Sequence, residues 1–291
     1  MDIYIAQYNA ISRYSLHNGI IIEEKNVPEP EYETVLDPRS MRRLSKILKM
    51  GIFTSLLAIR NIKVDGIICA TSLGCTYDTY AFLNNLIERK ENLLTPTPFI
   101  QSTHNTLAGT LGIVTGNHGY NMTWSNRNFS FFDALEDAIS RIMLRKGSAF
   151  LVTAADEMPE EIASIIQMMP FSTTANLNGE GASAFVLSNI YSPNSHQILS
   201  TEILPITKLD DYLSQLSSST HIINTHPTYK CHPSSLHHNI IHTTRSMIDD
   251  AFGLSIACQY ADFLKQKSDD HIEIVCLSGD KDNVSVIKLK K

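Results

Sequence analysis

Apolar and polar positions along this chain follow two periods, and each period predicts one kind of element. Between residues 131 and 144, apolar side chains recur three or four positions apart, which is typical of an amphipathic helix. Residues 148–153 form a compact apolar run, as in a buried strand, and 121–125 is a short β-prone segment. In folds built from βαβ units, functional residues are usually found in the turn between the first strand and the helix. We therefore expect the site within residues 119–157.

The same patterns predict elements before this unit. These are strands over 2–11 and 64–71, a long helix over 36–60, and helices starting near Thr76 and Thr106. Residues 16–34 are expected to form a loop, because Pro28 and Pro30 interrupt them. Pro96 and Pro98 are expected to delay the helix that follows residue 95.

Further elements are predicted after residue 130. Ser130 is placed to cap the helix over 131–144, with Asp133 three residues later. A helix followed by a loop is expected over 158–176, and a buried strand within 176–189. The rest of the chain predicts strands over 197–206, 220–224, 271–277 and 283–290, and helices over 210–217 and 252–265.

Composition narrows the function classes. The 291 residues carry a net charge of -6, which gives no reason to expect a nucleic acid or an anionic membrane as partner. No apolar run approaches the roughly 18 residues of a membrane span. The first residues lack a basic segment before an apolar core, so no signal peptide is expected. These features favour a cytoplasmic protein.

Cysteine and histidine spacing gives no metal or disulfide pattern. The 5 cysteines are scattered without a CxxC pair, which argues against a disulfide frame or a zinc knuckle. The stretch 226–242 is rich in histidine, and His238 and His242 could share a helical face. It lacks a matching carboxylate and compact ligand spacing, so a polar loop is favoured over a metal site. No metal and no cofactor are expected.

The central segment resembles the nucleophile region of the β-ketoacyl synthases, in the thiolase superfamily. That region reads roughly G-P-x-x-T-V-S-T-A-C-S-S-G, and the matching positions here are Gly119, Asn121, Thr123, Ser125, Ser130 and Ala134. The family's nucleophilic cysteine falls on Asn128. An amide nitrogen has no usable nucleophilicity, so covalent acyl transfer of that kind is not expected at Asn128.

A second segment carries the same resemblance. The synthases have G-E-G-A-G-A-x-V-L, which is matched here by Gly179, Glu180, Gly181, Ala182, Ala184, Val186 and Leu187. The glycines permit a tight backbone and close packing, and a buried Glu180 would need paired donors. The two motifs together cover about two-thirds of the chain.

The family's two catalytic histidines are poorly matched. The turn INTHPTYK places His226 on the first of them, although Pro227 and Tyr229 replace the family's glycines. The segment RSMIDDAFG lacks the lysine and the histidine of the second turn. One histidine out of three catalytic groups does not make a working synthase.

Other residues leave two interpretations open. Cys75, near a helix N-terminus, is either a reactive thiol or a small buried apolar residue. His104 and Asn105 precede the helix that starts at Thr106, and they are either structural or in contact across a dimer. The basic face of helix 36–60 is either solvated or a docking surface for an acidic carrier protein: Arg39, Arg42, Arg43, Lys46 and Lys49.

The resemblance implies a homodimer or heterodimer in which strand 121–125, with Met122 and Trp124, pairs with a partner's copy. Its fold would be α/β and thiolase-like, with two similar halves (1–190 and a shortened 191–291) in five αβαβα layers. The implied function is a non-catalytic, chain-length-factor-type subunit of polyketide, aryl polyene or fatty-acid-like synthesis, with an active ketosynthase and an acyl carrier protein as partners. The alternatives are an acyltransferase using Cys75, or His226 with a water, and a structural homodimer without substrate.

Overall fold

The computed structural model describes residues 1–160, 164, 168, 180–226, 229, 240–242, 249–268 and 271–291. Its strands form a 10-stranded sheet in the order β10-β9-β11-β12-β8-β1-β7-β6-β4-β5 and a separate hairpin, β2-β3. The strands are β1 (Ile3–Ile11), β2 (Tyr14–His17), β3 (Ile20–Glu23), β4 (Gly66–Ala70), β5 (Tyr120–Trp124), β6 (Ala149–Asp156), β7 (Gly181–Ser188), β8 (His196–Pro205), β9 (His221–Asn224), β10 (Ile240–His242), β11 (Glu273–Gly279) and β12 (Asn283–Lys290).

Helices cover both faces of the folded sheet. They are α1 (Pro38–Met41), α2 (Lys46–Ile59), α3 (Thr76–Glu88), α4 (Pro96–Gln101), α5 (Thr106–Thr115), α6 (Ser130–Met143), α8 (Leu209–Ser214) and α9 (Asp249–Lys265), with short 3-10 turns η1 (Tyr32–Thr34), η2 (Arg127–Phe129) and η3 (Ile206–Lys208).

The sheet consists of two halves with the same strand order. In the first half β1-β7-β6-β4-β5, the pairs β1–β7 and β6–β7 are antiparallel and the last two pairs are parallel. The second half β8-β12-β11-β9-β10 repeats this pattern. A short antiparallel pairing of β1 with β8 joins them. The division at residue 190 falls in the link between β7 and β8 and stays a prediction.

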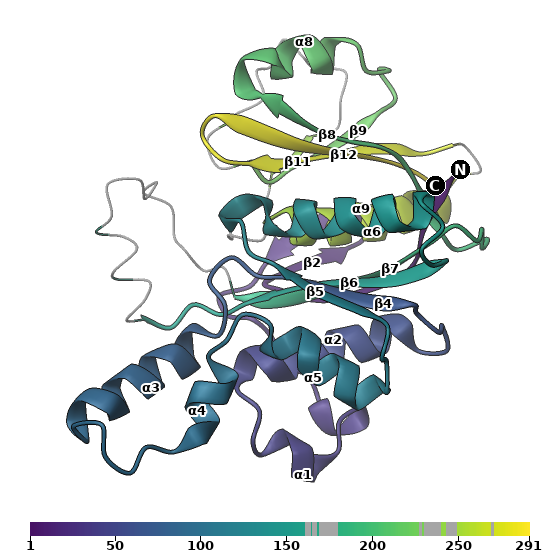
Figure 1. The fold of residues 1–291 in the computed structure, drawn as a ribbon. Helices are drawn as coiled ribbons and strands as arrows, with labels where there is room; N and C mark the ends of the chain where they lie inside the picture. Colours follow the sequence, from purple (N-terminus) through teal and green to yellow (C-terminus); the bar gives the residue numbers. More distant parts are fainter. Residues whose placement is uncertain are drawn as a thin grey trace.

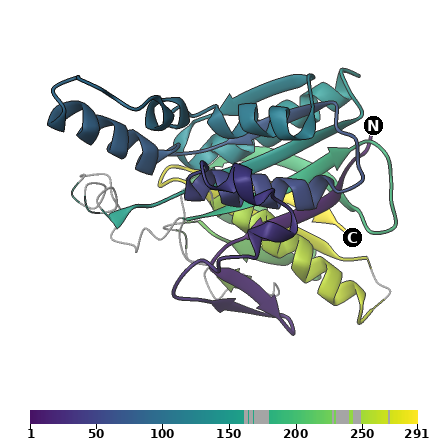
Figure 2. The ribbon, with the colours of Figure 1, turned by 90° about the horizontal axis from the view of Figure 1, so that it is seen from below.

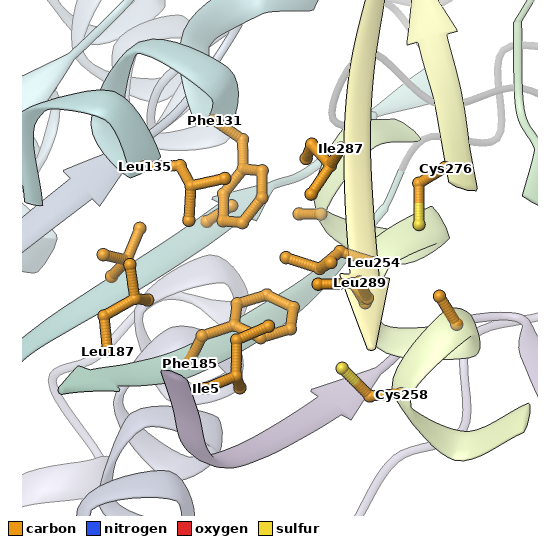
Figure 3. Close-up of a cluster of buried hydrophobic side chains, with 14 of the residues drawn as sticks. Ile5, Phe131, Leu135, Phe185, Leu187, Leu254, Cys258, Cys276, Ile287 and Leu289 are labelled. Atoms are coloured by element: carbon orange, nitrogen blue, oxygen red, sulfur yellow. The ribbon is translucent and has the colours of Figure 1, made fainter. Parts of the chain in front are cut away.

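The halves stack into the five predicted layers. Figure 1 shows α8 above the second half, α6 and α9 between the halves, and α2 and α5 beneath the first half. The middle layer is the main core, where side chains of α6 and α9 meet those of both halves (Figure 3). Phe131, Phe185 and Ile287 are each almost fully buried there. The thiolase-like αβαβα fold is thereby confirmed.

Several local predictions were wrong. The segment 16–34 is not only a loop, because it contains β3 and the end of β2, joined by Asn18 and Gly19 at φ of 53° and 82°. The expected helix over 36–60 is broken into α1 and α2. Pro96 does not delay a helix but begins α4, where a missing N–H costs nothing.

Two further predictions need correction. Ser130 does not cap α6, since its hydroxyl serves η2 instead: it accepts from Asn126 N at 2.8 Å and donates to Arg127 O at 2.6 Å. His242 lies on strand β10 and not on a helical face. His238 and most of the segment 158–176 lie outside the described residues.

Candidate functional site

Asn128 lies in the turn between β5 and α6, and its side chain makes a hydrogen bond to another part of the chain. Asn128 lies in η2, next to Arg127 at a φ of 49°. Its Nδ2 donates a hydrogen bond of 2.9 Å to the backbone oxygen of Gly279, at the end of β11. The amide therefore joins the first half of the sheet to the second, and no nucleophile occupies this position.

His226 lies at the end of β9, buried at 6% exposure. Its backbone N–H donates to Asn224 Oδ1 at 2.9 Å, and its Nδ1 accepts from Tyr229 N at 3.0 Å. Because Nδ1 accepts, the neutral ring carries its proton on Nε2. The preceding Thr225 N–H donates to Leu277 O at 2.8 Å. Asn128 and the residue before His226 thus bond to two backbone oxygens near the end of β11, those of Gly279 and Leu277.

The sequence analysis missed a third polar group here, Asp250. It lies in the first turn of α9, 2% exposed, within the segment RSMIDDAFG. Its Oδ2 accepts from Ser285 Oγ at 3.1 Å, while Oδ1 has no hydrogen-bond partner within the described residues. Burial raises the pKa of Asp250 to about 7, against hydrogen bonds from Ser278 and Ser285. The sequence shows two adjacent aspartates near the start of this helix, but it does not show that Asp250 is buried.

Two more buried carboxyls, Asp156 and Glu157, lie at the end of β6, next to the start of α3. Asp156 accepts from the Thr71 hydroxyl and from the backbone N–H of Ser72 and Leu73. Burial nevertheless raises its pKa to about 6. Glu157 accepts from Tyr77 N at 2.8 Å, and burial raises its pKa to about 7. These groups fasten the turn after β4 and the start of α3.

Cys75 is a buried thiol and not an exposed one. It precedes α3 at 3% exposure, and burial raises its pKa to about 12, with nearby carboxylates adding to the rise. A thiol in this state is protonated at neutral pH, which is the opposite of what a nucleophilic cysteine requires. His104 packs against Gly74 and lines a small cavity together with Cys75.

Asn105 immediately precedes α5, and Thr106 is its first residue. Asn105 Oδ1 accepts from the Thr103 hydroxyl at 2.9 Å and makes no cap to the helix. The Thr106 hydroxyl donates to Ile100 O at 3.1 Å. Both side chains thus hold the connection between α4 and α5 in place.

Met122 and Trp124 lie on the last strand of the sheet. They are 41% and 37% exposed, and β5 pairs only with β4 among the strands that the structure describes. Trp124 Nε1 donates to Asp137 at 3.2 Å, and Asp137 also pairs with Arg141 at 2.9 Å. An open strand edge presents unpaired backbone N–H and C=O groups, to which a further strand can add.

The second motif lies at the start of β7. Gly179 falls outside the described residues. Glu180 forms an ion pair with Lys46 and is not fully buried. Gly181 has a φ of 151°, and a Cβ there would approach Ile11 O to 2.5 Å and the Phe252 ring to 2.7 Å. Only glycine fits between β1 and α9 at this point.

The described residues lack two features that would have suggested other functions. No group of three or more His, Cys, Asp or Glu side chains in that part of the chain is arranged to hold a metal ion. No helix there is long and apolar enough to cross a membrane.

Solved structures with the same fold are ketosynthase-like. The chain superposes on "The ishigamide ketosynthase/chain length factor" with a TM-score of 0.74, at 13% identity over 99% of each chain. It superposes on a chain of the ketosynthase ApeO in complex with its chain length factor ApeC from Xenorhabdus doucetiae with a TM-score of 0.56, at 21% identity over 70% of this chain and 84% of that one. A β-ketoacyl synthase from Burkholderia phymatum gives 0.70 at 11% identity, over 100% and 99%.

Sequence comparison places the chain in a family. No curated protein matches it significantly. The family described as "Beta-ketoacyl synthase, N-terminal domain" matches residues 19–239, which is most of the chain. This match includes Asn128 and the Gly179–Gly181 motif on which the resemblance depended. The chain therefore belongs to the β-ketoacyl synthase N-terminal-domain family.

Proposed function

We propose that this chain is a non-catalytic, chain-length-factor-type subunit that pairs with an active β-ketoacyl synthase. The observation that carries the proposal is Asn128. By the motif match, Asn128 falls on the position of the family's nucleophile, and its amide donates a hydrogen bond to Gly279 O. Covalent acyl transfer needs a thiolate or an activated hydroxyl at this position, and an amide supplies neither.

Cys75 does not have the properties of a replacement nucleophile, and this supports the proposal. Its pKa is raised to about 12, and the carboxylates around it oppose formation of a thiolate. The cationic or helix N-terminal environment that activates a cysteine is outweighed here by burial. Nothing observed at Cys75 therefore favours the acyltransferase alternative.

Exposed apolar surface supports a partner. Helices α3 and α4 form an arm that projects beyond the sheet (Figure 2). Only Asp78 of α3 is buried, whereas Tyr77, Leu83, Ile87 and Phe99 are between 49% and 71% exposed. Exposed apolar patches of this kind mark interaction sites. Together with the open edge of β5, they favour a dimer in which β5 of each chain pairs across a two-fold axis.

The proposal includes an acyl carrier protein as a second partner. The exposed Arg39, Arg42 and Arg43 lie close together along the chain and offer positive charge to an acidic carrier. The solved complexes of a ketosynthase with its chain length factor and of an acyl-carrier protein with its ketosynthase support this choice. We propose polyketide or aryl polyene synthesis in the cytoplasm as the setting.

Co-expression tests the pairing. The chain would be produced beside a cysteine-containing ketosynthase of the same source, with an affinity tag on one of them only. We expect a 1:1 complex by sedimentation, of a mass that neither protein reaches alone. A chain that forms only a homodimer in the presence of the synthase would support the structural-homodimer alternative instead.

Acyl labelling tests catalytic silence. The purified chain, incubated with radiolabelled acyl carrier protein, should take up no label, while the synthase partner should. An acyl adduct on Cys75 would make the acyltransferase alternative correct. The variant Asn128→Cys is the matched control, because it restores only the thiol.

A further inference from the structure

The arm formed by α3 and α4 is attached to the rest of the chain through a buried acid. Asp78, in the first turn of α3, is the one residue of that helix that is buried, at 6% exposure. Leu83 and Ile87 of the same helix are apolar and exposed. A surface helix normally buries its apolar side and exposes its charges. Because α3 does the reverse, the surroundings of Asp78 decide how firmly the arm is held.

The surroundings of Asp78 are themselves acidic. Glu157, 4% exposed and just after β6, accepts a hydrogen bond of 2.8 Å from the N–H of Tyr77, the residue before Asp78. Asp156 is fully buried and accepts from the N–H of Ser72, in the turn that leads into α3, and from further donors, so it can stay ionised. Asp78 and Glu157, which we call the basal pair, therefore lie beside a third carboxyl.

No cation balances these three carboxyls within the described residues. None of them forms an ion pair there. Lys46 of α2 pairs instead with Glu180, which lies just before β7. Residues 158–179, which follow Glu157 in sequence, contain no Lys, Arg or His. The N-terminus of α3 contributes about half a positive charge, which is too little to balance two further carboxylates.

Protons take the place of a cation in the basal pair. Burial raises the pKa of Glu157 to about 7, although the hydrogen bond from Tyr77 opposes the rise. The charges of Asp78 and of two other carboxylates add to it. Burial also raises the pKa of Asp78, and the Ser45 hydroxyl offsets only part of that change. Because like charges disfavour one another at a buried site, the pair holds protons up to neutral pH.

The Asp78 carboxyl shows why a proton is needed. Its Oδ2 is buried and has no hydrogen-bond partner among the described residues. An ionised oxygen in that position would have neither water nor a donor, whereas a bound proton removes the charge. Two other titratable side chains face this turn: His104 packs against Gly74, and Cys75 is a neutral thiol, since burial raises its pKa to about 12. Neither forms an ion pair with the basal pair.

We propose that the basal pair is a proton-operated fastening of the arm, which holds α3 in place while it is protonated and loosens it on ionisation. Two ionised carboxylates beside Asp156 would repel one another in the attached arm, but water would solvate them in a loosened arm. The inference rests on the proposed function for its use, because the arm carries apolar surface that we assign to the synthase partner.

The direction of the pH dependence follows from proton binding. The pKa of Glu157 is about 7 in the attached arm and about 4.3 in water, so attachment takes up a proton that loosening releases. Attachment is therefore fully supported below about pH 4 and weakens as the pH rises through 7. Between pH 6 and pH 8, this single group should lower the ratio of attached to loosened arm about tenfold.

Hydrogen exchange of the isolated full chain, compared at pH 6 and pH 8 as protection factors, measures the loosening. Protection of the α3 amides should fall about tenfold in wild type. In Glu157→Gln the fall should be about threefold at most, because Gln keeps an acceptor for the Tyr77 N–H and cannot ionise. Glu88→Gln is the matched control: Glu88 is exposed on the same helix, its loss changes the net charge equally, and the wild-type fall should remain.

Two results would overturn the fastening. One is an equal fall of α3 protection in wild type and Glu157→Gln, which would show that Glu157 does not control the arm. The other is a fall that Glu88→Gln removes as well, which would show that net charge alone is responsible.

Affinity for the synthase gives a separate readout of how the arm is used. Wild type and Glu157→Gln should bind the synthase equally at pH 6, and wild type should bind more weakly at pH 8, by up to about tenfold. Equal binding at pH 8 would show that the arm lies outside the interface. Binding of neither chain at either pH would contradict the proposed function, whereas the exchange measurement decides the fastening on the isolated chain.

Discussion

The two halves of the sheet share one strand order, but their connections differ. Between β1 and β4 lie the hairpin β2-β3, η1, α1 and the 14-residue helix α2, whereas η3 and the 6-residue helix α8 lie between β8 and β9. The first half also inserts the arm of α3 and α4 between β4 and α5, and exposes apolar side chains on it. The repeated strand order thus fixes the layers, while the connections of the first half carry the surface available to a partner.

Asp156 in the first half and Asp250 in the second half are both buried near strand ends, but they differ in the hydrogen-bond donors around them. Asp156 in the first half accepts one hydroxyl and two backbone N–H groups. Asp250 in the second half has one unsatisfied oxygen and a carboxylate neighbour, Asp133. A buried carboxyl stabilises a fold only where donors replace water. We therefore expect Asp156 to stabilise the first half and Asp250 to destabilise the second half when it is ionised.

The largest effect is expected where the halves touch at Gly181. Gly181→Val would force a side chain against Ile11 O and the Phe252 ring at a backbone φ of 151°. Overpacking and strain together should lower the free energy of unfolding by more than about 3 kcal/mol. Gly109→Ala, in an open position of α5, is the control and should be neutral or slightly stabilising. Denaturant unfolding measures both, and equal stability of the two variants would show that β7 is not packed against α9.

The next largest effect is a difference in stability between substitutions of the two buried carboxyls, Asp156 and Asp250. Asp156→Asn should lower the free energy of unfolding by about 1–3 kcal/mol at pH 8, since an amide cannot accept all three hydrogen bonds. Asp250→Asn should raise it by about 1–3 kcal/mol at the same pH, because it removes a buried charge beside Asp133. Opposite signs would show that the two halves treat a buried carboxyl differently, and equal signs would show that they do not.

The pH dependence of the Asp250 effect follows from its pKa. That pKa is about 7 in the folded chain and about 3.9 in the unfolded chain, so the folded state keeps a proton that the unfolded state releases. Stability from this group is therefore fully present below about pH 4 and is lost as the pH rises to 7, by at most about 1.4 kcal/mol per unit. Thermal unfolding of wild type and Asp250→Asn across pH 5–8 should show the wild-type slope flattened in the variant.

Some features of the fold and of the candidate site could be predicted from the sequence, and others could not. Strand β12 was predicted at its observed bounds, and α6 within a residue, because periodic burial is written into local sequence. The β2–β3 hairpin was missed although Asn18–Gly19 is a known hairpin signal. The importance of Asn128 was predicted from its place in the motif that resembles the nucleophile region of the β-ketoacyl synthases. The burial of Asp250 could not be predicted, because it depends on Ser278 and Ser285, which lie about 30 residues away in sequence and meet α9 only in the folded chain.

A smaller effect concerns the open edge of β5. Met122→Lys places a charge on the exposed strand, and we expect it to weaken assembly with a synthase or with a second copy at least about tenfold. Ile20→Lys, on the hairpin that pairs with no strand of the large sheet, is the control and should assemble normally. Sedimentation over a concentration series decides between them. Equal affinity of both variants and wild type would exclude β5 as the interface.

The smallest effect is expected at Asn128, which joins the halves by one hydrogen bond. Asn128→Ala removes the donor to Gly279 O and leaves that carbonyl unsatisfied, so the free energy of unfolding should fall by about 1 kcal/mol. Asn128→Asp keeps the size but replaces the donor with an acceptor facing a carbonyl oxygen, and it should cost more than the alanine at pH 8. Denaturant unfolding at fixed pH gives this order. If both variants are as stable as wild type, the side chain is free to serve a ligand, and Asn128 is then a binding residue of the acyl site rather than a link between the two halves.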